Sequence, residues 1–323
     1  MNACFNIREI ETRAYHKPIV SLGTFDGVHL GHKAILERLK DKVKEKQTQS
    51  LVVTYEPHPQ SIVSPKDAPL VLTNLEEKLD LLEELDIHET IIIDFNKQFA
   101  EYSPEKFIQE MLIDKLDPQG VVIGYNHSFG KNRKGNTDLL KEESEKRGFE
   151  IEIVKPVNYK DSPISSTRIR HSLKSNNFEE ALNMLGHSYP LYGKVIQGKQ
   201  KGREIGYPTV NLQIDSRKLL PPDGVYAVES LVNNKKMYGM FYVGTNPTFE
   251  NKGRSLEIYF FDFEDNIHTG DKLKLYLKKW FRGEEKFGNM QDLKKQLQKD
   301  EFEIRTFFEK NQDTGGYLDA RQR

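Results

Sequence analysis

The chain has 323 residues, more than a single hydrophobic core usually organises, so two domains are expected. Its 48 lysines and arginines nearly balance its 49 aspartates and glutamates, and this leaves no charge excess to attract nucleic acid or an anionic membrane. The single cysteine, Cys4, excludes an intrachain disulfide, and residues 1–18 lack the apolar core of a signal peptide. No apolar run approaches the roughly 20 residues that span a bilayer. We therefore expect a cytoplasmic protein with no membrane segment and no nucleic-acid partner.

The first half of the chain, from residue 18 to about 186, alternates short β-branched runs with helical patterns. The β-branched runs are nearly continuous in apolar residues, as in strands that are buried on both faces of a parallel sheet. Strands joined by right-handed helical crossovers form a doubly wound parallel sheet, so an α/β fold is predicted. The strands are predicted over 19–22, 51–55, 90–94, 120–124 and 150–154, and one intervening helix carries Leu75, Leu79, Leu82 and Leu85 at helical spacing.

The second half of the chain has a different pattern of apolar residues. After a short helical run over 178–186, apolar and aromatic stretches follow at short intervals, separated by Gly, Pro and Asn. This pattern predicts an antiparallel sheet or small barrel. Residues 289–310 predict a terminal amphipathic helix. We expect one domain over 1–186 and a second over 187–323, and the sequence makes no prediction of the oligomeric state.

The decapeptide GTFDGVHLGH, residues 23–32, lies where the first predicted strand gives way to a helix. A helix start offers unsatisfied N–H groups and a partial positive charge, and doubly wound sheets bind ligands beyond the carboxyl ends of their strands. Gly23 and Gly27 permit a tight turn, and Gly31 lets an anion approach the first helical turn. His29 and His32 face the same side and can donate to phosphate oxygens. A plain glycine turn with surface histidines and a zinc-binding histidine pair remain open alternatives.

Two later stretches support a phosphate site. The sequence YEPHPQ, residues 55–60, follows the second strand and holds His58 between prolines, although a plain turn also explains it. The sequence SPISSTRIRHSL, residues 162–173, places hydroxyl groups before a short basic helix. A simple N-capped helix is the alternative there, because Ser and Thr cap helices well. Hydroxyls together with arginine at a helix start also suit a triphosphate.

These three stretches together resemble a known family. GTFDGVHLGH is similar to the HxGH signature of the nucleotidylyltransferase superfamily, and with PHP and ISSTRIR it resembles the FMN adenylyltransferase module of bacterial riboflavin biosynthesis proteins. The resemblance implies that an FMN phosphate oxygen attacks the α-phosphorus of ATP and that pyrophosphate leaves. Residues 124–135, GYNHSFGKNRKG, depart from the aromatic-rich segment that is common in that family. The resemblance implies catalytic roles for His29, His32 and Arg170, and binding roles for Gly23, Phe25, Asp26, Gly27, Gly31, His58, Asn126, Ser165, Ser166 and Thr167.

A second constellation begins at residue 193. The segment GKVIQGKQKGREIGYPTVNL, residues 193–212, combines glycines with four basic residues, and such a loop can close over a nucleotide. Thr209 and Asn211 share one face of a strand and are able to hold a hydrated Mg²⁺ together. A solvated basic hairpin is the alternative. Glu257 stands in an otherwise apolar, aromatic strand, where it is either a proton acceptor for an attacking hydroxyl or an exposed acid on a half-buried strand.

In order and spacing, GREIGYPTVN, GVYAV, NPTF, LEIYFFDF and WFRGEEKF are similar to the riboflavin kinase module. The resemblance implies that Glu257 is the base for the ribityl 5′-hydroxyl, that Thr209 and Asn211 bind magnesium and ATP phosphates, and that Arg282 and its loop cover the flavin. The other residues predicted to bind ligands in this half are Gly193, Lys199, Gly202, Arg203 and Pro208.

The two resemblances span roughly residues 18–310, in the order of bifunctional riboflavin kinase/FAD synthetases. They imply phosphorylation of riboflavin to FMN and adenylylation of FMN to FAD, with ATP as co-substrate and Mg²⁺ as cofactor. Two alternatives stay open: a chain of this architecture with only one working site, and a regulatory protein that binds flavin or nucleotide and uses its basic loop for RNA. Balanced charge counts against the second alternative.

Overall fold

The computed structural model describes residues 3–6, 16–87, 89–198, 201–232, 235–245, 254–262 and 267–311. The chain forms two compact units, Met1–Ser166 and Thr167–Arg323. This division falls before the boundary expected at 186/187, and it groups helix α8 (Phe178–Leu185) with the second unit. The ring of Phe178 contacts Tyr189 and Tyr226 of that unit, at 6.4 and 5.0 Å between centroids.

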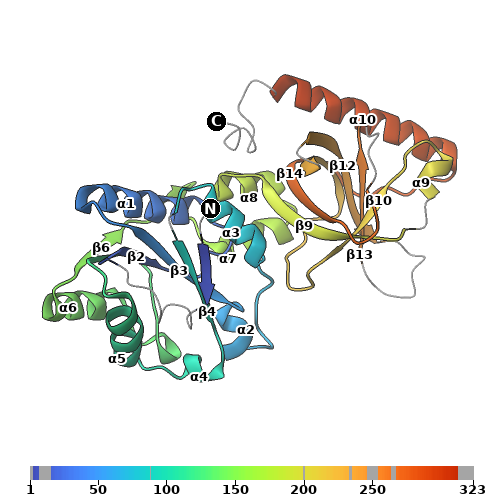
Figure 1. The fold of residues 1–323 in the computed structure, drawn as a ribbon. Helices are drawn as coiled ribbons and strands as arrows, with labels where there is room; N and C mark the ends of the chain where they lie inside the picture. Colours follow the sequence, from blue (N-terminus) through green and yellow to red (C-terminus); the bar gives the residue numbers. More distant parts are fainter. Residues whose placement is uncertain are drawn as a thin grey trace. The chain divides into compact units, whose positions relative to one another are not determined.

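The first unit contains a parallel sheet, as predicted. Its strand order is β1-β4-β3-β2-β5-β6, and every pairing is parallel (Figure 1). The five predicted strands are confirmed to within a residue at each end, whereas β1 was not predicted. The strands are β1 (Ala3–Asn6), β2 (Ile19–Leu22), β3 (Ser50–Glu56), β4 (Glu89–Asp94), β5 (Gly120–Gly124) and β6 (Glu150–Val154).

Helices cover both faces of this sheet. Helix α1 (Leu30–Lys46) lies on one side, and α5 (Pro104–Lys106), η2 (Phe107–Leu116) and α6 (Thr137–Arg147) cover the other (Figure 1). The apolar side chains of η2 and of β2 to β5 form one core cluster. The shorter elements are α2 (Pro59–Val63), α4 (Lys97–Ala100), η3 (Lys131–Arg133), β7 (Asn158–Tyr159) and β8 (Ser162–Pro163).

Helix α3 (Leu75–Glu83) differs from the prediction. The expected apolar face carried Leu75, Leu79, Leu82 and Leu85, but the buried residues are Glu77, Lys78, Leu81 and Leu82. The difference has a physical reason: both charged side chains have polar partners that apolar spacing does not reveal. The carboxylate of Glu77 accepts from the N–H of Asn74 in a capping box, and Lys78 binds main-chain and hydroxyl oxygens.

The strand order of the sheet predicts at which edge a ligand binds. From β2 the chain winds outward to β3 and β4, and then returns to the other side of β2 to form β5 and β6. Such a reversal opens a crevice beyond the carboxyl ends of the central strands. The turn before α1, the loop after β3 and the loop after β5 all lie at this edge.

The second unit is a closed antiparallel barrel with the order β10-β13-β12-β11-β14-β9, which confirms the predicted barrel (Figure 1). Cross-strand partners such as Phe241 and Ile258 are fully buried and fill its interior. The strands are β9 (Tyr189–Ile196), β10 (Val210–Ile214), β11 (Gly224–Val232), β12 (Lys235–Thr245), β13 (Arg254–Phe260) and β14 (Lys272–Arg282).

Besides α8, the described part of the second unit contains the helices α7 (Ser166–Lys174), which begins at the last residue of the first unit, α9 (Lys201–Glu204) and α10 (Met290–Asn311). The long helix α10 confirms the predicted terminal helix. Its Ile304 and Phe308 pack on the outer face of the barrel, against a cluster that includes Tyr207, Met240 and Phe261. Within the described ranges, no helix is both long enough and apolar enough to cross a membrane.

Candidate active sites

The turn between β2 and α1 has an unusual backbone. Gly27 has a φ of 84°, and Phe25 and Val28 also have positive φ values, 48° and 37°. Left-handed conformations are unfavourable for side chains of this size, so surrounding contacts must hold them. Phe25 and Val28 are almost completely buried, which supplies apolar contacts for both.

The side chain of Asp26 holds the backbone of this turn in place. Its buried carboxylate accepts hydrogen bonds from the N–H groups of Leu72 and Thr73, at 2.8 and 3.0 Å. The hydroxyl of Thr73 in turn accepts from the N–H of Gly27 at 2.9 Å. The structure therefore gives Asp26 a role in fixing the turn, and its predicted contact with a ligand stays a prediction.

His29 and His32 lie together at the start of α1. Their rings stack with centroids 3.6 Å apart and planes inclined by 14°. His29 is the N-cap residue, and its Nδ1 accepts from the N–H of His32 at 3.3 Å. Because Nδ1 accepts, the proton of a neutral His29 ring resides on Nε2, which can donate to an anion.

His32 is held in its neutral form. Burial, followed by the nearby His29 and Lys78, keeps the pKa of His32 well below its usual range. Its Nδ1 is buried, and no partner for it lies within the described residues. A polar atom of this kind lacks a hydrogen bond that a bound ligand or water would supply.

Gly31 makes room for the histidine pair. A Cβ placed there would lie 3.1 Å from Cε1 and 3.2 Å from Nδ1 of His29. The structure thus gives Gly31 a packing role beside the His29 imidazole, and its predicted contact with a ligand stays a prediction. At Gly23 a Cβ would lie 3.0 Å from the ring of Phe25, so this glycine serves the packing of the turn.

Two other predicted residues lie at the same edge of the sheet. His58 follows β3 and caps α2, where its Nδ1 accepts from the N–H of Gln60 at 3.2 Å. Its Nε2 is therefore a donor when the ring is neutral, as in His29. Asn126 follows β5 and is exposed. Since β3 and β5 flank β2, the topology brings these residues to the edge that carries the His29 turn.

The hydroxyl segment also reaches this turn. Ser166 Oγ donates to the carbonyl oxygen of Asp26 at 2.9 Å, which joins two motifs 140 residues apart in the sequence. Ser165 is half-buried beside it. Thr167 and Arg170 belong to the second unit, where Thr167 is exposed and Arg170 is buried on α7. Their part in a triphosphate site stays a prediction.

In the barrel, the structure brings Thr209 and Glu257 together. Thr209 Oγ1 donates to one carboxylate oxygen of Glu257 at 3.0 Å, and Ser255 Oγ donates to the other at 2.8 Å. Asn211 is the cross-strand partner of Glu257, so both side chains lie on one face. Glu257 is half-buried on the face opposite Ile258, and so it lies outside the barrel interior.

The glycine-rich segment packs tightly beside these residues. A Cβ at Gly198 would lie 2.0 Å from Nδ2 of Asn211, and one at Gly202 would lie 2.1 Å from the carbonyl oxygen of Tyr207. Since the contact at Gly202 is with backbone, only glycine permits that approach, whereas at Gly198 any other residue would displace the Asn211 side chain. Gly193 sits on β9 against Ile214, and Arg203 and Pro208 are exposed. Lys199 lies outside the described residues.

Arg282, predicted to cover the flavin, has a structural partner. Its Nε donates to Asp300 Oδ1 at 2.9 Å and its Nη2 to Oδ2 at 2.7 Å. Despite the opposing effect of burial, the hydrogen bonds and charge of Asp300 raise the pKa of Arg282. In the following loop, Glu284 accepts from the hydroxyl of Tyr242 at 2.6 Å. The loop is thus tied to α10 and to β12, and its flavin contact stays a prediction.

The donor set around Thr209 fits a magnesium ion. A hydroxyl that donates its proton to Glu257 retains its lone pairs for a cation, and the Asn211 side chain lies on the adjacent position of the same strand face. Hydroxyl, amide and carboxylate oxygens are the hard ligands that Mg²⁺ accepts, together with water and phosphate oxygens. Within the described residues, no three His, Cys, Asp or Glu side chains converge as a metal site.

Four polar residues of these networks were missed by the sequence interpretation: Thr73, Lys78, Ser255 and Asp300. Thr73 and Lys78 contact the turn at residues 23–29, and Asp300 holds Arg282. Lys78 and Asp300 are polar residues at helix positions that face the protein, and periodicity alone treats such positions as exposed. Thr73 and Ser255 lie outside the helices, so helical spacing says nothing about them.

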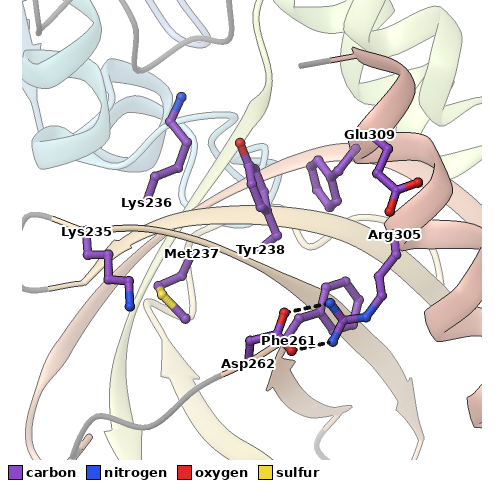
Figure 2. A pocket seen from close by; sticks show the side chains of 9 residues that line it. Lys235, Lys236, Met237, Tyr238, Phe261, Asp262, Arg305 and Glu309 are labelled. Carbon is purple, nitrogen blue, oxygen red and sulfur yellow. Dashed lines mark hydrogen bonds and ion pairs between the residues drawn. The ribbon is translucent and has the colours of Figure 1, made fainter.

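A separate cavity of about 260 Å³ opens beside α10. Figure 2 shows Tyr238 and Phe261 on its walls and the ion pair of Arg305 with Asp262 at one side. None of the predicted site residues lines this cavity. The candidate active sites are therefore defined by the polar networks described above.

Comparison with known proteins covers both units. The FAD synthetase family model matches residues 11–168, and the riboflavin kinase model matches residues 185–308. The bifunctional riboflavin kinase/FMN adenylyltransferase of Listeria monocytogenes is 37% identical over 298 residues, which cover 91% of this chain and 94% of that protein. The Escherichia coli K12 protein of the same name is 33% identical over 291 residues, with 90% and 92% covered.

A solved structure shares the fold along nearly the whole chain. It is described as a macrolide-efflux protein from Streptococcus pneumoniae, and it is 30% identical with a TM-score of 0.83, covering 94% of this chain and 98% of that one. The two family models match in the order that the motifs predicted, and the curated relatives match over both units. The chain therefore belongs to the bifunctional riboflavin kinase/FMN adenylyltransferase family.

Proposed function

We propose that the barrel unit phosphorylates riboflavin to FMN and that the N-terminal unit adenylylates FMN to FAD, each with ATP as co-substrate. The observation that carries the proposal is the pair of polar networks. One gathers His29 and His32 at the carboxyl edge of a doubly wound sheet, and the other joins Thr209 to Glu257 on the barrel. Family membership supports the same division of labour.

In the adenylyltransferase site, an FMN phosphate oxygen attacks the α-phosphorus of ATP, and pyrophosphate leaves. The reaction needs alignment and charge stabilisation rather than a covalent enzyme intermediate. His29 donates from Nε2 to phosphate oxygens, because its Nδ1 is engaged by the N–H of His32. The first N–H groups of α1 add to this anion site.

In the kinase site, the ribityl 5′-hydroxyl of riboflavin attacks the γ-phosphorus of ATP, and ADP leaves. Glu257 accepts the hydroxyl proton as general base, and Thr209 and Ser255 orient its carboxylate. Thr209 and Asn211 would hold Mg²⁺, which when bound neutralises charge on the phosphates. A cytoplasmic location, consistent with the single cysteine, is part of this proposal.

Separate assays of the two half-reactions test the proposal. Glu257→Ala should abolish FMN formation from riboflavin and leave FAD formation from supplied FMN intact. The double variant His29→Ala/His32→Ala should do the reverse. Equal loss of both reactions in either variant would contradict two independent sites. Wild-type protein that makes FMN but never FAD would indicate a single working site.

A further inference from the structure

Lys78 is a buried lysine that neither proposed reaction uses. Its side chain extends from α3, and the residue is only 4% exposed. The ammonium donates to the carbonyl oxygen of Thr24 at 3.2 Å, to Thr54 Oγ1 at 3.0 Å and to the carbonyl oxygen of Tyr55 at 3.3 Å. Burying a lysine is costly, so a site with three oriented acceptors needs an explanation.

The three acceptors belong to two neighbouring strand ends. Thr24 lies in the turn after β2, and Thr54 and Tyr55 lie in the last part of β3. Thr54 Oγ1 also donates to the carbonyl oxygen of Thr24 at 3.1 Å. Lys78 thus ties the turn that leads to His29 to the strand that leads to His58.

The same stretch of chain holds the other end of the turn. Leu72 and Thr73 donate to Asp26, while Lys78 donates to Thr24. Residues 72–78 therefore bind the turn at two of its residues, Thr24 and Asp26. The capping box of Asn74 and Glu77 sets the start of α3 and thereby the position of Lys78. The positive charge of Lys78 is also among the causes that keep the pKa of His32 low.

We propose that Lys78 is a positioning residue of the adenylyltransferase site, which holds the turn at residues 23–29 so that His29 and His32 face the polyphosphate of ATP. The inference rests on the proposed function of this unit. Three protein oxygens lie within hydrogen-bond distance of the ammonium, so Lys78 acts through the turn and through its fixed charge. Misplacement of an aligned group by about 1 Å can cost 100-fold in rate.

The test compares Lys78→Met, Lys78→Arg and the control Lys44→Met, which removes an exposed lysine from α1. FAD formation is measured from FMN and ATP, and ATP affinity is measured by calorimetry. Lys78→Met should lower kcat at least 30-fold, with less than a fivefold change in the Kd for ATP. Lys78→Arg should recover part of kcat, because it keeps the charge, and Lys44→Met should match the wild type. Riboflavin kinase activity should stay unchanged in all three.

A second variant covers the case in which Lys78→Met unfolds the unit. Thr54→Val keeps the volume but removes one acceptor of Lys78 and the bond to Thr24, so it should lower kcat three- to tenfold with ATP affinity retained. The inference is overturned if Lys78→Met keeps kcat within threefold of the wild type, or if Lys78→Met unfolds and Thr54→Val has full activity. Wild-type protein that forms no FAD would instead overturn the proposed function of this unit.

Discussion

The buried ion pair between Arg282 and Asp300 should make a large contribution to the free energy of unfolding of the barrel unit. Two parallel hydrogen bonds join these side chains, which are 17% and 3% exposed, and Gln296 donates to Asp300 at 2.8 Å. Asp300→Asn keeps the shape but removes the charge and leaves the guanidinium without its ionised partner. Breaking a buried pair in this way typically costs about 3–5 kcal/mol.

The expected cost lies at the lower end of that range. Arg282 retains some contact with water, and the asparagine oxygen can still accept one hydrogen bond, so we expect about 3 kcal/mol. In a unit as large as Thr167–Arg323, each kcal/mol shifts the Tm by about 2–4 °C, and the Tm should therefore fall by roughly 6–12 °C.

Tryptophan fluorescence is the matching assay, because the only tryptophan, Trp280, lies on β14 of the barrel. The control is Asp262→Asn, which breaks a similar bidentate pair with Arg305, at 2.6 and 3.0 Å, where the aspartate is 79% exposed. An exposed pair contributes about 1 kcal/mol or less, so the Tm should fall by no more than about 4 °C. Equal shifts for the two variants would refute the argument from burial.

Two further predictions concern the first unit. Gly31→Ala should lower the rate of FAD formation at least tenfold and leave riboflavin phosphorylation unchanged, because the new Cβ would crowd the His29 ring. An unchanged rate of FAD formation would show that the His29 ring can move without loss of activity. Burial, with a smaller effect of Arg133, lowers the pKa of His127 to about 4. Between about pH 6.5 and 4 the unfolded chain therefore binds more protons than the folded unit. The free energy of unfolding should accordingly decrease as the pH falls from about 6.5 to 4. The His127 resonance, assigned by its loss in His127→Asn, should not titrate in NMR spectra above about pH 5, and a midpoint near 6.5 would contradict the burial.

The periodicity of the chain was enough to predict both architectures. The strands of the parallel sheet are buried on both faces, so their continuous apolar runs were visible in the sequence, and β2, β5 and β6 were predicted to the residue. The strand β1 was missed because its sequence, ACFN, has no β-branched residue, whereas the equally short β2 has Ile19 and Val20. The charged face of α3 was missed because spacing rules treat charges as exposed.

The sequence by itself determined the fold class, the motifs and the choice of His29, His32, Thr209 and Glu257 as candidate site residues. Residue type and local spacing are sufficient for this, because both can be read directly from the chain. Only the tertiary structure decided which partners hold them. Lys78 reaches Thr24 across 54 residues, and Asp300 reaches Arg282 from a separate helix. Contacts of this kind depend on how elements pack in three dimensions, and no local pattern of residues encodes that packing.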